Sequence, residues 1–310
     1  MSDRAASVWP DLDVPGWSET RDTLHMWLQI VGKVRLALTP LLNHWWNVPL
    51  YVSARGLTTS LMHSGGRGLE IEFDFVDHVL QLRTTDGQSR QIALESQSVG
   101  GFYRATMGAL AELGIDVHIR ARPTEIEDAI PFEQDDVHHT YERDVALRLW
   151  LALVQVDRVL TVFRSRFIGK ASPVHLFWGG ADLCTTRFSG RTAPRHRGGV
   201  PNCPDWVQVL AYSHEVSSAG FWPGGGGAPP LFYAYAYPEP PGFAEWPVEP
   251  AGASYEAQLG EFVLPYSEVR SAADPDAALF AFLQSTYEAA AELAQWDRAE
   301  LEWDPARAPL

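Results

Sequence analysis

The stretch FYRATMGALAEL at residues 102–113 has a counterpart in FLQSTYEAAAEL at residues 282–293. Without a gap, six of the twelve positions are identical: one Phe, one Thr, two Ala, one Glu and one Leu. A short apolar pattern precedes each copy, IALESQSV at 92–99 and FVLPYSEV at 262–269. Matches that recur in the same order along a chain indicate an internal repeat. The chain is therefore predicted to consist of two related halves.

The earlier parts of the two halves also align. LQIVGKV at 28–34 falls on VQVDRVL at 154–160, and LYVSARGLTTS at 50–60 falls on LFWGGADLCTT at 176–186. Strands that are joined by short turns and bracketed by helices favour an α+β class. We expect two similar helix–antiparallel strands–helix halves that form an internal pseudo-dimer. The predicted units are a first repeat at 1–121, an acidic connecting loop at 122–143, and a second repeat at 144–310 that carries the site.

Apolar periodicity and turn residues predict the individual elements. The expected helices cover 20–42, 99–113, 143–168 and 274–296. The expected strands cover 48–54, 57–62, 69–75, 78–84, 91–95, 115–121, 174–178, 182–188, 207–217, 231–237 and 261–264. Thr20 or Ser18 is expected to cap the first helix, and Asp274 with Pro275 to open the last one. Gly114 is expected just beyond the end of the second helix.

Composition excludes several classes of function. The 310 residues carry a formal net charge of −15, so a nucleic acid or an anionic membrane would repel the chain. No run of 18 apolar residues is present, and the first residues lack the apolar core of a signal peptide. Only two cysteines occur, which favours a reducing cytoplasm over a disulfide scaffold. The expected partner is a small molecule, and the oligomeric state is left open.

The segment SPVHLFWGGADLCTTRFSGR at 172–191 carries reactive side chains that its counterpart in the first half lacks. There, His175, Asp182, Cys184 and Arg187 replace Pro, Gly, Thr and Leu. A tight turn at the two glycines would place Phe177 opposite Asp182, and His175 opposite Cys184. Alternation along the strands would then put His175, Asp182 and Cys184 on one face and Arg187 on the other.

Other polar residues complete the candidate set. His214 and Glu215 are adjacent in AYSHEVSSAGFWPG at 211–224, and Arg187 and Arg191 have the planar fork that suits an anionic group. His25 and Lys33 share one face of the first long helix with Gln29, which is either a solvent face or a cleft wall. The proposed substrate-binding set is Arg187, Arg191, Trp178, Trp222, His25 and Lys33.

Metal and nucleophile chemistry remain alternatives. A divalent metal is possible if His175, His214 or His138 converge with a carboxylate, although their spacing matches no compact metal motif. A Cys184–His175 pair would require a thiolate of lowered pKa, and a serine beside His214 lacks the usual sharp-turn motif. The glycine run at 224–227 lacks the ending of a phosphate-binding loop, so a linker is favoured.

The segments at 20–38, 54–60, 172–191 and 211–224 resemble an uncharacterised bacterial family that is catalogued as domain of unknown function 5996. The resemblance covers nearly the whole chain and implies no activity. It favours His175, Asp182, Arg187 and Arg191, together with the Ser-His-Glu triplet at 213–215. This chain departs from the family pattern at Gly180-Ala181 and at Cys184, which argues against Cys184 as a shared nucleophile.

The leading expectation is a cytoplasmic enzyme that acts on a small polar or anionic molecule. His214, Glu215, His175 and Asp182 would supply acid/base groups or metal ligands, and the arginines would hold an anionic group. The alternative is a non-catalytic binding protein with an aromatic-lined cleft, in which polar groups only orient the ligand. A third interpretation is a scaffold whose histidines and arginines satisfy the core.

Overall fold

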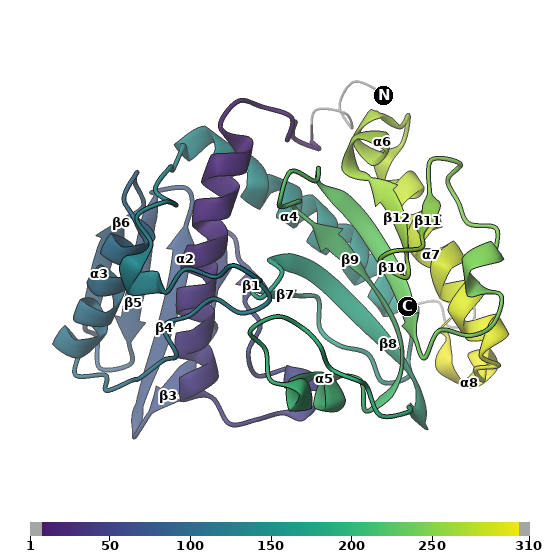
Figure 1. Cartoon of the computed structure of the whole chain (residues 1–310), viewed down its shortest axis with the longest axis horizontal. Helices are drawn as coiled ribbons and strands as arrows, with labels where there is room; N and C mark the ends of the chain where they lie inside the picture. Colours follow the sequence, from purple (N-terminus) through teal and green to yellow (C-terminus); the bar gives the residue numbers. More distant parts are fainter. Residues whose placement is uncertain (1–7, 304–310) are drawn as a thin grey trace.

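The computed structural model describes residues 8–303, and the predicted outer ends of the two halves, at 1–7 and 304–310, lie outside the described residues. The chain is an α+β protein with two six-stranded antiparallel sheets, as predicted. Helices precede and follow each sheet along the chain. Figure 1 shows α2 crossing the first sheet, with α4 and α7 along the second.

The first sheet has the strand order β1-β2-β4-β5-β6, and β3 pairs with β4 beside this path. Its strands are β1 (Tyr51–Val52), β2 (Gly56–Thr58), β3 (Met62–Ser64), β4 (Arg67–Asp74), β5 (Val79–Thr84) and β6 (Ser89–Ala93). Before it come α2 (Trp17–Leu38) and the 3-10 turn η1 (Asn43–Trp45), and after it come α3 (Val99–Glu112) and η2 (Phe132–Gln134).

The second sheet has the order β7-β8-β9-β10-β12-β11. Its strands are β7 (His175–Phe177), β8 (Asp182–Thr192), β9 (His214–Trp222), β10 (Leu231–Tyr237), β11 (Ser254–Glu256) and β12 (Glu261–Pro265). The associated helices are α4 (Arg143–Ser165), α5 (Asp205–Ala211), η3 (Phe243–Glu245), α6 (Tyr266–Ser271), α7 (Pro275–Leu293) and α8 (Arg298–Leu301).

The two sheets meet edge to edge. Leu50, beside β1, forms an antiparallel bridge with Leu176 of β7. Each sheet runs outward from this junction through successive antiparallel strands, with a long helix before the first strand and another helix after the last. This arrangement agrees with two similar halves, while a duplication as their origin stays a prediction.

Several local predictions are confirmed. The β7–β8 hairpin pairs Phe177 with Asp182 and His175 with Cys184. Asp274 caps α7 by accepting a hydrogen bond from the backbone of Ala277. Such a side-chain oxygen satisfies one of the free N–H groups at a helix start. These signals are local, so neighbouring residues alone determine them.

Three local predictions are wrong. Residues 115–121 are extended but form no strand, because their alternating burial is not accompanied by a neighbouring strand. Residues 207–211 belong to α5 and not to a strand, since Val207, Leu210 and Ala211 pack on the core from one helical face. α2 begins after Gly16, whose φ is +76°, and not after a side-chain cap.

The second sheet has two contrasting faces, and this contrast positions the site. Leu183, Phe221, Phe232 and Leu264 belong to the face that packs into the core with α4 and α7. Side chains alternate across a strand, so the intervening residues of β8, β9 and β10 point the other way. They line a cavity.

Candidate functional site: an aromatic cavity with two carboxyl groups

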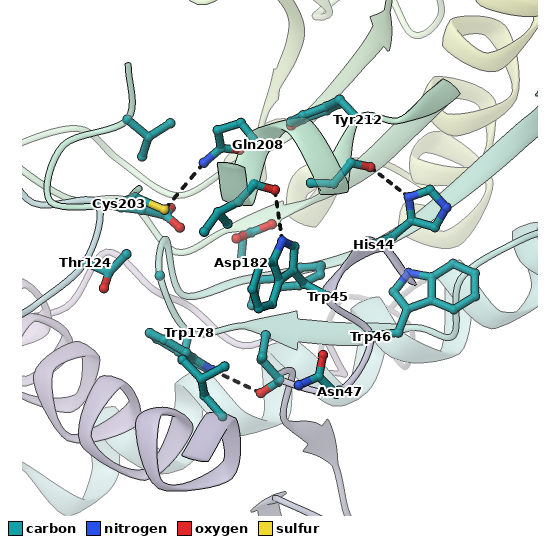
Figure 2. Close-up of a pocket in the computed structure, with 18 of the residues that line it drawn as sticks. His44, Trp45, Trp46, Asn47, Thr124, Trp178, Asp182, Cys203, Gln208 and Tyr212 are labelled. Atoms are coloured by element: carbon teal, nitrogen blue, oxygen red, sulfur yellow. Dashed lines mark hydrogen bonds between the residues drawn. The ribbon is translucent and has the colours of Figure 1, made fainter. Parts of the chain in front are cut away.

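A cavity of about 650 Å³ lies over the second sheet. Its floor comes from the hairpin turn and from β8, β9 and β10, and its walls come from α2, η1, α5 and the segments near 120–125 and 200–204. Figure 2 shows Asp182 and Trp45 between two sides of the cavity, with His44 and Trp46 on one side and Cys203 and Thr124 on the other. The volume suits a small organic molecule.

Asp182 is the central polar group of the floor. It begins β8, and its carboxylate accepts a hydrogen bond from the hydroxyl of Tyr233 on β10. Burial raises the pKa of Asp182 to about 6, although the Tyr233 bond favours the ionised form. Tyr235, two residues along β10, shares a hydrogen bond of 2.9 Å with Tyr212. The floor therefore pairs the carboxyl group of Asp182 with one phenol hydroxyl and carries a separate pair of bonded phenol hydroxyls.

Glu125 brings a second carboxyl group to the cavity from the segment that connects the halves. Its backbone N–H donates to the carbonyl of Pro201, which links the two covering segments. Glu125 is an exposed residue, although many protein atoms surround its carboxyl group. Desolvation by these atoms, followed by the charge of Asp182, raises the pKa of Glu125 to about 7, while Lys33 acts in the opposite direction.

The two carboxyl groups both approach the hairpin turn at Gly180. An Oδ1 of Asp182 lies 3.2 Å, and Oε2 of Glu125 lies 3.8 Å, from the position that a Cβ on Gly180 would occupy. Neither carboxylate forms an ion pair within residues 8–303. The charge of Asp182 opposes ionisation of Glu125. Near neutral pH the pair is therefore suited to carry one proton, with one carboxyl group neutral and the other ionised.

Two glycines make room for functional side chains. A Cβ on Gly179 would lie 2.1 Å from Oε1 of Glu125, so only glycine lets this carboxyl group approach the hairpin turn. A Cβ on Gly32 of α2 would lie 2.2 Å from the ring of Trp178, which therefore packs directly on the helix backbone. Trp178 is fixed there because its Nε1 donates to the carbonyl of Val48 at 3.0 Å.

A third glycine serves the floor. A Cβ on Gly220 of β9 would lie 2.8 Å from the hydroxyl of Tyr233 and 2.6 Å from the carbonyl of Leu183. The Tyr233 side chain can therefore cross β9 to reach Asp182 on β8. A glycine inside a strand often marks such a close approach.

The polar stripe of α2 faces the protein interior and not the solvent, and its Lys33 lines the cavity. Gln29 is fully buried, and its amide both donates to and accepts from the backbone of Thr124, at 2.9 and 2.7 Å. Lys33 donates to the Thr124 hydroxyl at 2.8 Å, and burial lowers the pKa of Lys33 to about 8. His25 donates to the carbonyl of Gly179 at 2.7 Å. The stripe thus fixes both the hairpin turn and the segment that bears Glu125.

The other side of the cavity is aromatic and is held by η1. Nε1 of Trp45 donates to the carbonyl of Val207 at 2.9 Å, and Nδ1 of His44 donates to that of Ala211 at 2.8 Å. These two bonds attach α5 over the cavity. Trp206, at the start of α5, leaves 55% of its surface exposed at the rim. Residues 207–211, which were predicted to form a strand, thus belong to α5, the helix that covers the cavity.

A second cavity of about 400 Å³ lies on the other side of Glu125. It includes three of the residues that the sequence analysis proposed: His25, Trp222 and His138. Nδ1 of His138 lies 2.8 Å from a carboxylate oxygen of the buried Asp135. Glu125 and Gly179 border both cavities, so this wall is shared.

The structure brings together only part of the predicted site. Asp182, Trp178 and Lys33 line the main cavity. His25 supports the hairpin turn from behind, and Trp222 lies in the second cavity. Three of the ten residues proposed for catalysis or substrate binding therefore share the main cavity, and the others lie elsewhere.

The two arginines that were expected to hold an anion are engaged within the fold. Arg187 is 1% exposed, and its guanidinium carbon lies 3.5 Å from the ring centroid of Phe163 and 4.3 Å from that of Tyr287. Burial lowers the pKa of Arg187 to about 10. Arg191 pairs with Glu215 at 2.7 Å and also donates to carbonyls at the end of α7. Arg187, Arg191 and Glu215 do not line the main cavity.

The three candidate metal-ligating histidines are in three separate places. His175 is fully buried with its ring edge-on to Phe177, and neither ring nitrogen has a hydrogen-bond partner within residues 8–303. Burial, aided by Arg35, lowers its pKa to about 3. His214 packs against His44 instead, at 5.5 Å between ring centroids. In the described part of the chain no three His, Cys, Asp or Glu side chains form a group that could hold a metal ion.

Sequence reasoning missed the partners of Asp182. Tyr233 and Tyr235 alternate along LFYAYAY, a strand that the sequence did predict, and this alternation signals one hydroxyl-bearing face. Glu125 stands in an irregular acidic loop, where no periodicity indicates which residue turns inward. Cys184 is buried, and burial raises the pKa of its thiol well above the usual value, which opposes a nucleophilic role.

The chain belongs to a family of unknown function, DUF5996, whose model matches residues 9–303. No curated protein and no solved structure matches this chain. No helix within the described residues is both long enough and apolar enough to span a bilayer. The family membership confirms the resemblance of the four sequence segments and assigns no activity.

Proposed function

We propose that this protein is a cytoplasmic enzyme that performs acid/base chemistry on a small polar molecule in the aromatic cavity. The observation that carries the proposal is that the carboxyl groups of Asp182 and Glu125 both approach the hairpin turn at Gly180. Their pKa values are raised to about 6 and about 7. A catalytic acid or base works best when its pKa is close to the operating pH.

The surroundings give the two carboxyl groups different roles. Asp182 accepts a hydrogen bond from Tyr233, which stabilises its ionised form. Asp182 is thus the better candidate for the base. Glu125 lacks such a donor within the described residues and has the higher pKa, which favours its neutral form as the acid. When the environments of two neighbouring carboxyl groups push their pKa values apart, one group commonly acts as the catalytic acid and the other as the catalytic base.

Lys33 and the cavity walls support the pair. Lys33 is held by Thr124, and its ammonium lies 5.3 Å from the ring centroid of Trp178. The charge of Lys33 favours ionisation of Glu125. A molecule bound against the aromatic walls would displace water, which would strengthen its electrostatic interactions with the carboxyl groups. Arg187 and Arg191 are bound within the fold. An anionic substrate in this cavity would therefore not contact the two arginines that the sequence suggested.

A non-catalytic binding protein is the second candidate. The aromatic lining by Trp45, Trp46, Trp178 and Trp206 favours it, because such walls bind flat or apolar groups without chemistry. In that case Asp182 and Glu125 would fix the orientation of a ligand that leaves unchanged.

Turnover in a complex mixture separates the two candidates. Purified protein is incubated with a bacterial small-molecule extract, and mass spectrometry follows every compound over time. Wild-type protein should deplete a compound and accumulate a product, and Asp182→Asn and Glu125→Gln should each slow this by at least about a hundredfold. Asp116→Asn is the matched control, because this aspartate is 94% exposed and outside the cavity. Depletion at equal rates in all four proteins would remove the carboxyl pair from catalysis.

A further inference from the structure

We propose that the ligand of the aromatic cavity is an organic cation, an amine or quaternary ammonium group carried on an apolar body. This inference rests on the proposed site and extends it to a chemical class of substrate. It reverses the anionic class that the arginine-rich strand motif suggested.

The first argument is the charge that remains available in the cavity. Asp182 and Glu125 converge from two segments without an ion pair among residues 8–303, and Glu261 stands close enough for the charge of Asp182 to affect it. The cations that line the cavity are Lys33, which already donates to Thr124, and the exposed Arg120. A cationic group between the carboxylates would therefore pair with two carboxyl groups that have no ion-pair partner within residues 8–303.

The second argument is the nature of the walls. Trp and Phe rings attract cations placed over their faces. Two lysines already lie over aromatic rings that line this cavity. The Lys33 ammonium lies 5.3 Å from the ring centroid of Trp178, and the Lys170 ammonium lies 4.7 Å from that of Phe188. A ligand cation at the floor would meet Trp178 and the phenol rings of β10 as well as the carboxylates.

The third argument concerns the exposed apolar part of the lining. Three large apolar residues of the lining, Leu36, Leu41 and Trp206, are 37%, 54% and 55% exposed. Exposed apolar surface in the lining of a cavity favours the binding of an apolar group. A lining that combines carboxyl groups with exposed apolar residues matches a ligand that has a charged head and an apolar body.

Three probes with one apolar body test the charge of the head: 4-phenylbutylamine, 4-phenylbutanol and 4-phenylbutyrate. Isothermal calorimetry with the full chain at about pH 7.5 should give at least about tenfold tighter binding of the amine than of either other probe. Asp182→Asn should weaken amine binding by about tenfold and leave alcohol binding unchanged, and Asp116→Asn should change neither. Glu125→Gln repeats the comparison if Asp182→Asn does not fold.

Preference for 4-phenylbutyrate, or equal binding of the three probes, would overturn the cationic class. Amine affinity that is unchanged in both Asp182→Asn and Glu125→Gln would also overturn it. The outcomes distinguish this inference from the proposed catalysis. Amine binding without turnover in any extract removes the enzyme and keeps the ligand class. Turnover of a neutral or anionic compound that depends on the carboxyl groups would support the enzyme and overturn the cationic ligand class.

Discussion

Leu50 and Leu176 exchange both of their backbone hydrogen bonds, at 2.9 and 2.8 Å, where the two sheets join. The same two residues coincide when the halves of the sequence are aligned. Contact between equivalent residues is what a two-fold axis between identical subunits produces. The pairing therefore agrees with the predicted duplication, and it places the hairpin that bears Asp182 beside the junction.

Gly179→Ala should displace Glu125. The new methyl group would overlap the carboxyl group, since the ideal Cβ lies 2.1 Å from Oε1. The loss of folding free energy should be small, because the atom in the way is the far end of a flexible side chain. Carboxyl carbon resonances followed by NMR against pH should show a changed pKa for Glu125, whereas Gly66→Ala, with no atom within 4 Å of its Cβ, should leave that pKa unchanged. An unchanged titration of Glu125 in Gly179→Ala would contradict the close approach.

Tyr233→Phe should raise the pKa of Asp182 above its value of about 6, because the hydroxyl donates to the ionised carboxylate. A shift of about one unit corresponds to about 1.4 kcal/mol, which is typical of one hydrogen bond to a charged group. Carboxyl carbon resonances followed by NMR against pH would measure it. Tyr237→Phe is the control, since that hydroxyl donates to the carbonyl of Pro194 at 3.0 Å. A downward shift would exclude the assigned donor.

His175→Phe should flatten the acid side of the stability profile. The pKa of His175 is about 3 in the folded chain against 6.5 ordinarily, so the unfolded chain binds the proton first. Stability from this neutral ring is fully present above about pH 6.5 and is lost as the pH falls toward about 3. Between about pH 6.5 and 5 wild type should lose about 1.5 kcal/mol more than the variant. The exposed His139, changed to Phe, should leave the slope as it is in wild type.

Arg187→Met and Arg191→Met should show whether these arginines contribute to the stability of the fold or to ligand binding. Arg187 lies between aromatic rings and donates to the carbonyl of Phe163, so its loss should cost about 2–4 kcal/mol in denaturation experiments. The partly exposed Arg191 ion pair should cost at most about 1 kcal/mol. Neither change should alter probe binding in the cavity. Weaker binding in the folded Arg187→Met protein would return this residue to the site.

The fold was largely predictable because its signals repeat and are local. The β7–β8 register followed from the length of the turn between Phe177 and Asp182, and the α7 start followed from Asp274 and Pro275. The segment at 207–211 was misassigned because its β-branched residues suit a strand, whereas contacts to Trp45 and His44 select a helix. Tertiary contacts override weak propensities in this way.

The candidate site was predicted only in part, at two positions on regular elements. Asp182 was found because a strand position carried an unexpected carboxylate, and Lys33 because helical spacing placed it on a common face with Gln29. Glu125 was not found, since its inward position depends on Gly179 and on a contact to the segment near 201. His175 and Arg187 lie outside the main cavity, buried beside aromatic rings, and a functional role for either stays a prediction.

The glycines at 32, 179 and 220 show that the shape of this cavity depends on positions without a side chain as well as on the side chains that line it. Each gives a different side chain its place: Trp178, Glu125 and Tyr233 respectively. A mutational scan that ranks positions by sensitivity should therefore place these three beside the carboxyl groups, although none can donate a proton or hold a ligand. In redesign, enlarging any of them would be a way to silence the cavity without touching its chemistry.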